Sequence, residues 1–70
     1  MTKLEKLCEI EGMTEEELFK ASLFGDSCMG ICMNEGCDYT TEVEPDQTKG
    51  WCDECQTNSI KSGLILGGII

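Results

Sequence analysis

Two turns that each carry a pair of cysteines decide the fold of this chain: Cys32-Met33-Asn34-Glu35-Gly36-Cys37 and Cys52-Asp53-Glu54-Cys55. A tetrahedral structural zinc site takes four ligands, and a chain supplies them most easily as two tight turns that each give two sulfurs. The intervening segment has the pattern of a strand followed by a turn-rich connection, so a hairpin can bring the two turns together. The spacing therefore predicts one metal ion bound by Cys32, Cys37, Cys52 and Cys55.

Two further cysteines have different expected roles. Cys28 precedes Cys32 by a three-residue spacer, so it is a possible substitute for one of the four ligands; otherwise it is a small buried hydrophobic residue. Cys8 shares a predicted helix face with Leu4 and Leu7, which favours packing in the core. Because the chain contains no histidine, any metal site is all-sulfur or includes a carboxylate.

The first cysteine turn also suggests its own backbone conformation. Asn34 and Gly36 can both adopt the positive φ angles that a tight loop needs. We therefore expect these two residues to close this turn.

Chain length sets how such a domain is stabilised. At 70 residues the chain has room for one core, and the free energy gained by burying its apolar surface is nearly cancelled by chain entropy. A cross-link or a metal ion is therefore expected. Residues 1–6 lack the pattern of a signal peptide, so we expect a cytoplasmic protein whose cysteines are reduced and serve as metal ligands or buried thiols.

The N-terminal part has helical periodicity. Apolar residues at helical spacing predict a short amphipathic helix that ends near Gly12. Thr14 and Glu17 have the spacing of a capping box, which predicts a second helix that ends at Gly25. The buried stripe of this second helix is expected to consist of Leu18, Phe19 and Leu23.

After Gly25 the pattern alternates as in strands. A half-buried strand is predicted over residues 38–44, a turn-rich connection over 45–50, and a further strand around Ile60. Trp51 is expected to anchor the core beside the second cysteine turn, although an exposed indole would serve as a contact residue. The run Leu64-Ile65-Leu66 predicts a third buried strand, with an exposed apolar edge as the alternative.

These residues carry a resemblance. The segment from Cys32 to about Ser62 resembles a zinc ribbon, the two-knuckle, three-stranded module of transcription factors, polymerase subunits and many small bacterial proteins. More narrowly, GICMNEGCDYTTEVEPD (residues 30–46), GWC (50–52) and LILGGII (64–70) are similar to short uncharacterised zinc-ribbon proteins of bacteriophage and bacteria. The resemblance covers about the last 40 residues and implies zinc bound by the four cysteines, but no known activity. Zinc-ribbon knuckles usually place Gly after the second Cys, whereas this chain has Asp38 and Gln56.

We therefore expect a small α+β metal-stabilised domain: short N-terminal helices followed by a zinc-ribbon β-hairpin with a third strand. It would form one folding unit, with a helical arm over residues 1–27 and the ribbon over residues 28–70.

The charge restricts the classes of partner. Fourteen Asp and Glu against five Lys give a net charge of −9, which disfavours direct binding to nucleic acids and to anionic membranes. The same charge steers the protein toward a partner with a basic surface. The longest apolar run, residues 63–70, is far shorter than the roughly 20 residues that span a bilayer.

The expected function is that of a non-enzymatic protein-interaction module, for example one that acts on transcription or replication machinery. Four thiolates leave zinc no open position, and without histidine no Ser–His or Cys–His nucleophile pair exists. The alternatives are a rubredoxin-like iron electron carrier, against which the four-residue gap between Cys32 and Cys37 counts, and a nucleic-acid-binding ribbon or nucleic-acid mimic.

Overall fold

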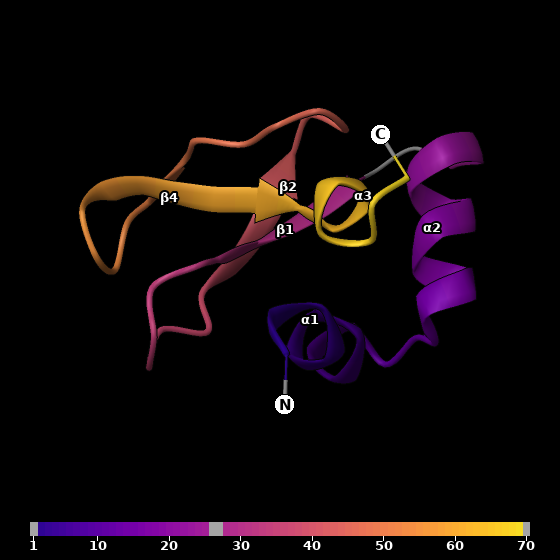
Figure 1. Ribbon diagram of the computed structural model, residues 1–70, viewed down its shortest axis with the longest axis horizontal. Helices are drawn as coiled ribbons and strands as arrows, with labels where there is room; N and C mark the ends of the chain where they lie inside the picture. The colour runs from indigo at the N-terminus through magenta and orange to yellow at the C-terminus, as the bar shows by residue number, and fades with distance from the viewer. Residues whose placement is uncertain (1, 26–27, 70) are drawn as a thin grey trace.

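The computed structural model describes residues 2–25 and 28–69. Its elements, in chain order, are α1 (Lys3–Glu11), α2 (Glu15–Phe24), β1 (Cys28–Cys32), β2 (Thr40–Val43), β3 (Gly50–Cys52), β4 (Thr57–Ser62) and α3 (Gly63–Leu66). The four strands form one antiparallel sheet in the order β2-β1-β4-β3. In Figure 1, α1 lies below this curled sheet, and α2 and α3 lie beyond one of its ends. The expected α+β class is confirmed, but the sheet has four strands rather than three.

Both long helices begin with a capping box. At α2 the Thr14 hydroxyl accepts from the Glu17 N–H at 3.1 Å, and the Glu17 carboxylate accepts from the Thr14 N–H at 2.9 Å, as the sequence predicted. Thr2 and Glu5 form the same arrangement at α1. The backbone hydrogen bond from each threonine lowers the pKa of its glutamate. Gly12 ends α1 in the left-handed conformation, with φ of 70°.

The helices bury one face of the sheet. We call the buried residues on this face the helical core: Leu7, Cys8, Leu18 and Ile31, with the partly buried Leu4, Met13, Met29 and Leu66 around them. Cys8 therefore packs in the core, as expected. The prediction for Leu23 was wrong, because this side chain is 50% exposed. Ser22 takes the buried position one turn after Leu18, and its hydroxyl donates to the Leu18 carbonyl at 2.8 Å.

The opposite face holds a second, smaller cluster. We call it the sheet cluster: Cys32, Cys52 and Ile60, with the partly buried Cys37, Tyr39, Val43 and Cys55 packed against them. A Cβ atom on Gly30 would lie 2.9 Å from the side chains of both Ile60 and Val43, so only glycine fits between them. Four of the seven residues in this cluster are cysteines, so its apolar content is low.

The C-terminal apolar run forms a helix, not the strand that its sequence predicts. The expected strand at residues 64–66 is the short helix α3, whose N-cap Ser62 accepts from the Ile65 N–H at 3.2 Å. A short apolar run fits either element, and here the Ser62 cap favours the helix. The sequence pattern did not predict strand β1, which lies in the interior of the sheet between β2 and β4. Its β2 neighbour is shorter than the predicted range of 38–44.

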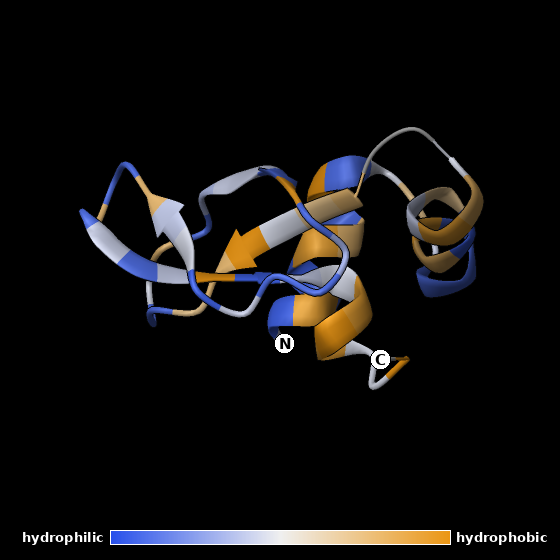
Figure 2. Cartoon of the chain, turned by 90° about the horizontal axis from the view of Figure 1, so that it is seen from above, coloured by the Kyte–Doolittle hydropathy of each residue, from blue (hydrophilic) through white to orange (hydrophobic). Residues whose placement is uncertain are grey.

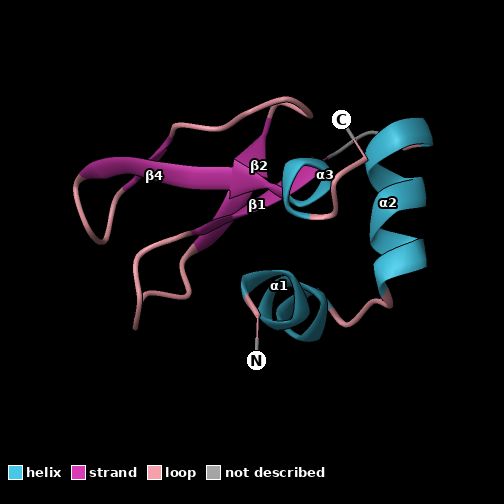
Figure 3. Ribbon diagram, viewed as in Figure 1, coloured by secondary structure: helices cyan, strands magenta, loops and turns pink. Residues whose placement is uncertain are grey.

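The two ends of the molecule differ in hydrophobicity. Figure 3 shows the loops that carry the cysteine turns at the end of the sheet opposite α2. Figure 2 shows that this end is mostly hydrophilic or neutral, whereas hydrophobic residues concentrate toward the helices. Among the helices formed by residues 2–25 and 28–69, none has the length and apolarity needed to cross a membrane. The cysteine end therefore has little hydrophobic packing of its own.

Candidate metal centre

Four thiols converge at the cysteine end of the sheet. Cys32 ends β1 and Cys52 ends β3, while Cys37 and Cys55 come from the turns that follow these strands. Their Sγ atoms all lie within 4.8 Å of one another. The Sγ atoms of Cys32 and Cys55 are 3.8 Å apart, and so are those of Cys37 and Cys52.

These distances match a tetrahedral thiolate site. Metal–sulfur bonds of about 2.3 Å give a tetrahedron with edges of about 3.8 Å. The two measured pairs share no residue, so they correspond to two opposite edges of such a tetrahedron. The four cysteines are thus positioned for metal ligation and are compatible with a zinc-ribbon-like site. The same set of four sulfurs suits zinc or iron.

The remaining cysteines lie elsewhere. Cys28 starts β1 and Cys32 ends it, a separation of about 13 Å along an extended strand. Cys28 is buried there, and Cys8 is buried in the helical core. All six cysteines are among the described residues, and each is a free thiol. The structure therefore leaves Cys28 outside the group that it brings together.

The second turn holds its cysteines with backbone hydrogen bonds. The Cys55 N–H donates to Cys52 Sγ at 3.4 Å, and the Gln56 N–H donates to the Cys52 carbonyl at 2.7 Å. Gln56 closes the turn with φ of 57°, in the left-handed region that favours glycine. Zinc-ribbon knuckles usually carry Gly after the second cysteine, whereas this chain places Gln56 in a conformation that glycine adopts more easily.

The first turn is closed by Gly36, with φ of 84°, as expected. Asn34 does not have a positive φ. Its carbonyl instead accepts from the Cys37 N–H at 3.1 Å, and its side-chain amide donates to Thr57 Oγ1 at 3.2 Å. Asn34 therefore connects the first turn to β4.

The thiols differ in acidity. Burial opposes ionisation of Cys32, but hydrogen bonds from the Ser59 hydroxyl, 3.1 Å from the sulfur, and from the Asn34 backbone lower its pKa to about 7. Burial raises the pKa of Cys52. The Tyr39 backbone acts to lower the pKa of Cys37, but the Cys55 thiol and burial outweigh it and raise that pKa. Metal binding requires thiolates, so it would displace the protons that these thiols retain.

Helix α1 contacts the first cysteine turn, which the sequence pattern does not predict. The Lys3 ammonium donates to the Asn34 carbonyl at 2.8 Å and to the Cys37 carbonyl, and it lies 3.6 Å from the Asp38 carboxylate. Lys6 also reaches Asp38, at 3.3 Å. The Lys3 side chain is only 16% exposed. The helical arm therefore holds the ligand turn and places a cation beside it.

Comparisons with known proteins leave the family open. No protein-family model matches this chain, and neither the curated proteins nor the solved structures gave a match.

Replacing Gln56 with glycine is expected to stabilise the metal-loaded protein by about 1 kcal/mol, because glycine adopts the left-handed conformation without steric cost. Asn58→Gly, in the extended backbone of β4, is the matched control and should destabilise it by about 0.5–1 kcal/mol. Urea unfolding of both variants checks this. A loss of stability in Gln56→Gly would contradict the geometry of the second turn.

Replacing Lys3 with methionine is expected to weaken metal binding about tenfold, because the variant loses the hydrogen bonds that hold the first turn. Lys20→Met removes an equal charge from an exposed i,i+4 pair with Glu16 and should leave affinity nearly unchanged. Competition with a chromophoric chelator measures both. Equal affinities for the two variants would show that Lys3 has no role at the site.

Proposed function

We propose that this protein binds one zinc ion through Cys32, Cys37, Cys52 and Cys55 and acts, without catalysis, as a small acidic interaction module. Its partner is a protein with a basic surface, such as a component of transcription or replication machinery. The observation that carries the metal assignment is the convergence of four sulfurs with two opposite edges of 3.8 Å. Zinc is preferred over iron because the four-residue gap between Cys32 and Cys37 counts against a rubredoxin-like iron site.

A structural role for the metal follows from its coordination. Four protein sulfurs complete the tetrahedron, so such an ion has no open position for water or substrate, and zinc has no redox chemistry. The chain also lacks histidine, which removes the usual general base at neutral pH. What zinc supplies is folding free energy, roughly 10–16 kcal/mol in small zinc domains.

A basic partner follows from the charge. Within the described ranges 2–25 and 28–69, three of the five lysines pair with carboxylates: Lys3, Lys6 and Lys20. Four thiolates with one Zn²⁺ would add −2 to the −9 of the chain. Most of the carboxylates are exposed, so they are available to a cationic surface.

Protein purified without chelators is expected to contain one zinc per chain and to be colourless. Cys32→Ala and Cys52→Ala should reduce the bound zinc to near zero, whereas the control Cys28→Ala should retain one equivalent because Cys28 lies outside the cluster. Elemental analysis with native mass spectrometry measures this. Loss of zinc in the control variant alone would overturn the ligand assignment, and a red protein bleached by dithionite would make it an iron electron carrier.

Immobilised zinc-loaded protein is expected to retain a basic protein from lysate of the native host and to release it as salt rises, because screening weakens charge attraction. Protein stripped of metal with a chelator is the control and should retain much less. Bound proteins are identified by mass spectrometry. Capture of no protein, or of acidic proteins only, would contradict the interaction role.

A further inference from the structure

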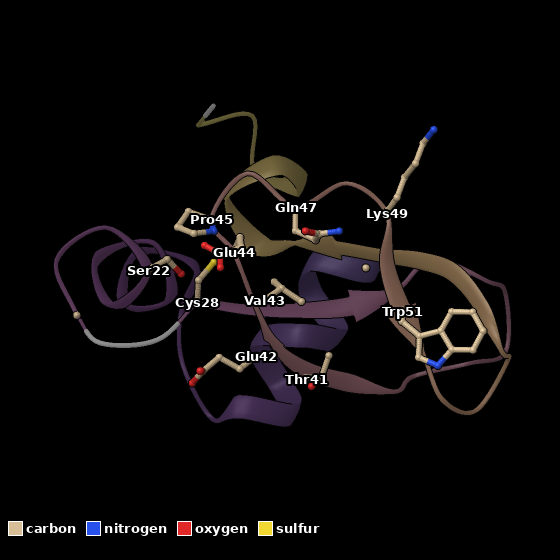
Figure 4. Close-up of a pocket in the computed structure, with 12 residues that line it drawn as sticks. Ser22, Cys28, Thr41, Glu42, Val43, Glu44, Pro45, Gln47, Lys49 and Trp51 are labelled. Atoms are coloured by element: carbon tan, nitrogen blue, oxygen red, sulfur yellow. The ribbon is translucent and has the colours of Figure 1, made fainter.

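A groove of about 670 Å³ follows β2 and reaches Trp51, the residue before the second cysteine turn. Figure 4 shows β2 running along its middle, with Ser22 and Cys28 on one side and Lys49 and Trp51 on the other. The groove thus extends from the end of α2 across β2 to β3. It is separate from the four clustered cysteines, none of which lines it.

The strand in this groove has a free edge. β2 pairs only with β1 in the part of the chain that the structure describes. The Cys32 N–H donates to the Tyr39 carbonyl at 2.9 Å, which identifies that pair as hydrogen-bonded. Hydrogen-bonded and non-hydrogen-bonded pairs alternate along an antiparallel ladder, so Thr40 and Glu42 direct their backbone N–H and C=O groups outward. An extended chain laid beside β2 could bond to them.

The groove has a negative rim and one aromatic surface. Glu42 and Glu44 are exposed and form no ion pair within residues 2–25 and 28–69. Trp51 is 53% exposed, which corrects its expected role as a core anchor, and its indole N–H donates to Asp53 at 2.9 Å. A fixed aromatic face beside a carboxylate suits a guanidinium or ammonium group. Lys49 is the one cation among the lining residues.

A second copy of this chain fits the edge poorly. Antiparallel pairing of two β2 strands would bring the Glu42 and Glu44 carboxylates of the two copies close together, and like charges on paired strands are destabilising. A basic strand would meet the same carboxylates with favourable charge. The negative charge along this edge therefore favours a basic strand over a second copy of this chain.

We propose that the β2 groove binds an extended basic segment of a partner protein, which adds to the sheet as a further strand. This inference rests on the proposed function and names the part of the partner that is recognised. Main-chain bonds to Thr40 and Glu42 supply the pairing, and side chains on alternate faces supply the selectivity. One face of the segment meets Glu42 and Glu44, and the other meets Val43 and the Trp51 ring. The recognised sequence alternates Arg or Lys with apolar residues.

The test uses the zinc-loaded full chain and a labelled peptide of about eight residues that alternates arginine with valine. A peptide with glutamate in place of each arginine, and one N-methylated at alternate amides, are the peptide controls. Binding is followed by anisotropy, and the emission of Trp51, the only tryptophan of the chain, reports its location. Hydrogen exchange of the Thr40 and Glu42 amides reports strand pairing.

The arginine–valine peptide is expected to bind, shift Trp51 emission and slow exchange at both amides, while the two control peptides bind much more weakly. Glu42→Gln with Glu44→Gln should weaken binding about tenfold. Glu9→Gln with Glu11→Gln removes equal charge from α1, which does not line the groove, and should change affinity by less than about twofold.

Three results would overturn the inference. Equal weakening by the two double variants would show that net charge alone binds the peptide. Tight binding of the N-methylated peptide would exclude strand addition. Absence of peptide binding, or self-association of the protein through β2, would show that the groove does not take a basic segment. If host capture still returned a basic protein, the proposed function would stand with its contact elsewhere on the surface.

Discussion

Convergence of four cysteine sulfurs is the constraint on which the rest of this structure depends. The sheet cluster contains only one fully buried apolar side chain other than cysteine, Ile60, with Val43 and Tyr39 partly buried beside it. Burial of one such side chain stabilises by about 1.5–3 kcal/mol, whereas structural zinc contributes roughly 10–16 kcal/mol. The proposed ion would therefore be the dominant cohesive element on this face of the sheet. The helical core packs against the opposite face of the sheet and does not stabilise this one.

None of the four clustered sulfurs comes from β2, the strand at one edge of the sheet. The sulfurs join the ends of β1 and β3 to the turns that follow, so they close the sheet at one end only. The outer edge of β2 stays free, and the groove beside it reaches Trp51. Exposed carboxylates along this edge oppose pairing with another copy of the chain. The proposed metal centre thus leaves one strand of the sheet with an unpaired edge.

The features that the sequence predicts correctly are those whose signal lies in neighbouring residues. The Thr14 capping box, the Gly12 and Gly25 helix ends and the positive φ of Gly36 all follow from neighbouring residues, and the cysteine spacing predicted which four thiols come together. The features that the sequence does not predict depend on contacts between residues far apart in the chain. Both faces of β1 are covered, so this strand lacks an alternating pattern. Lys3 looks like a solvent-facing lysine of an amphipathic helix, and only the docking of α1 brings it to the first turn.

The most direct test of this account is a zinc titration of the fully reduced, metal-free chain, followed by two-dimensional amide NMR. The account predicts that amide signals of residues 28–62 are poorly dispersed without metal and reach the dispersion of a folded sheet at one equivalent of zinc, with no change beyond it. A well-dispersed spectrum before any zinc is added, unchanged by the titration, would contradict the claim that a metal–thiolate centre holds the sheet together.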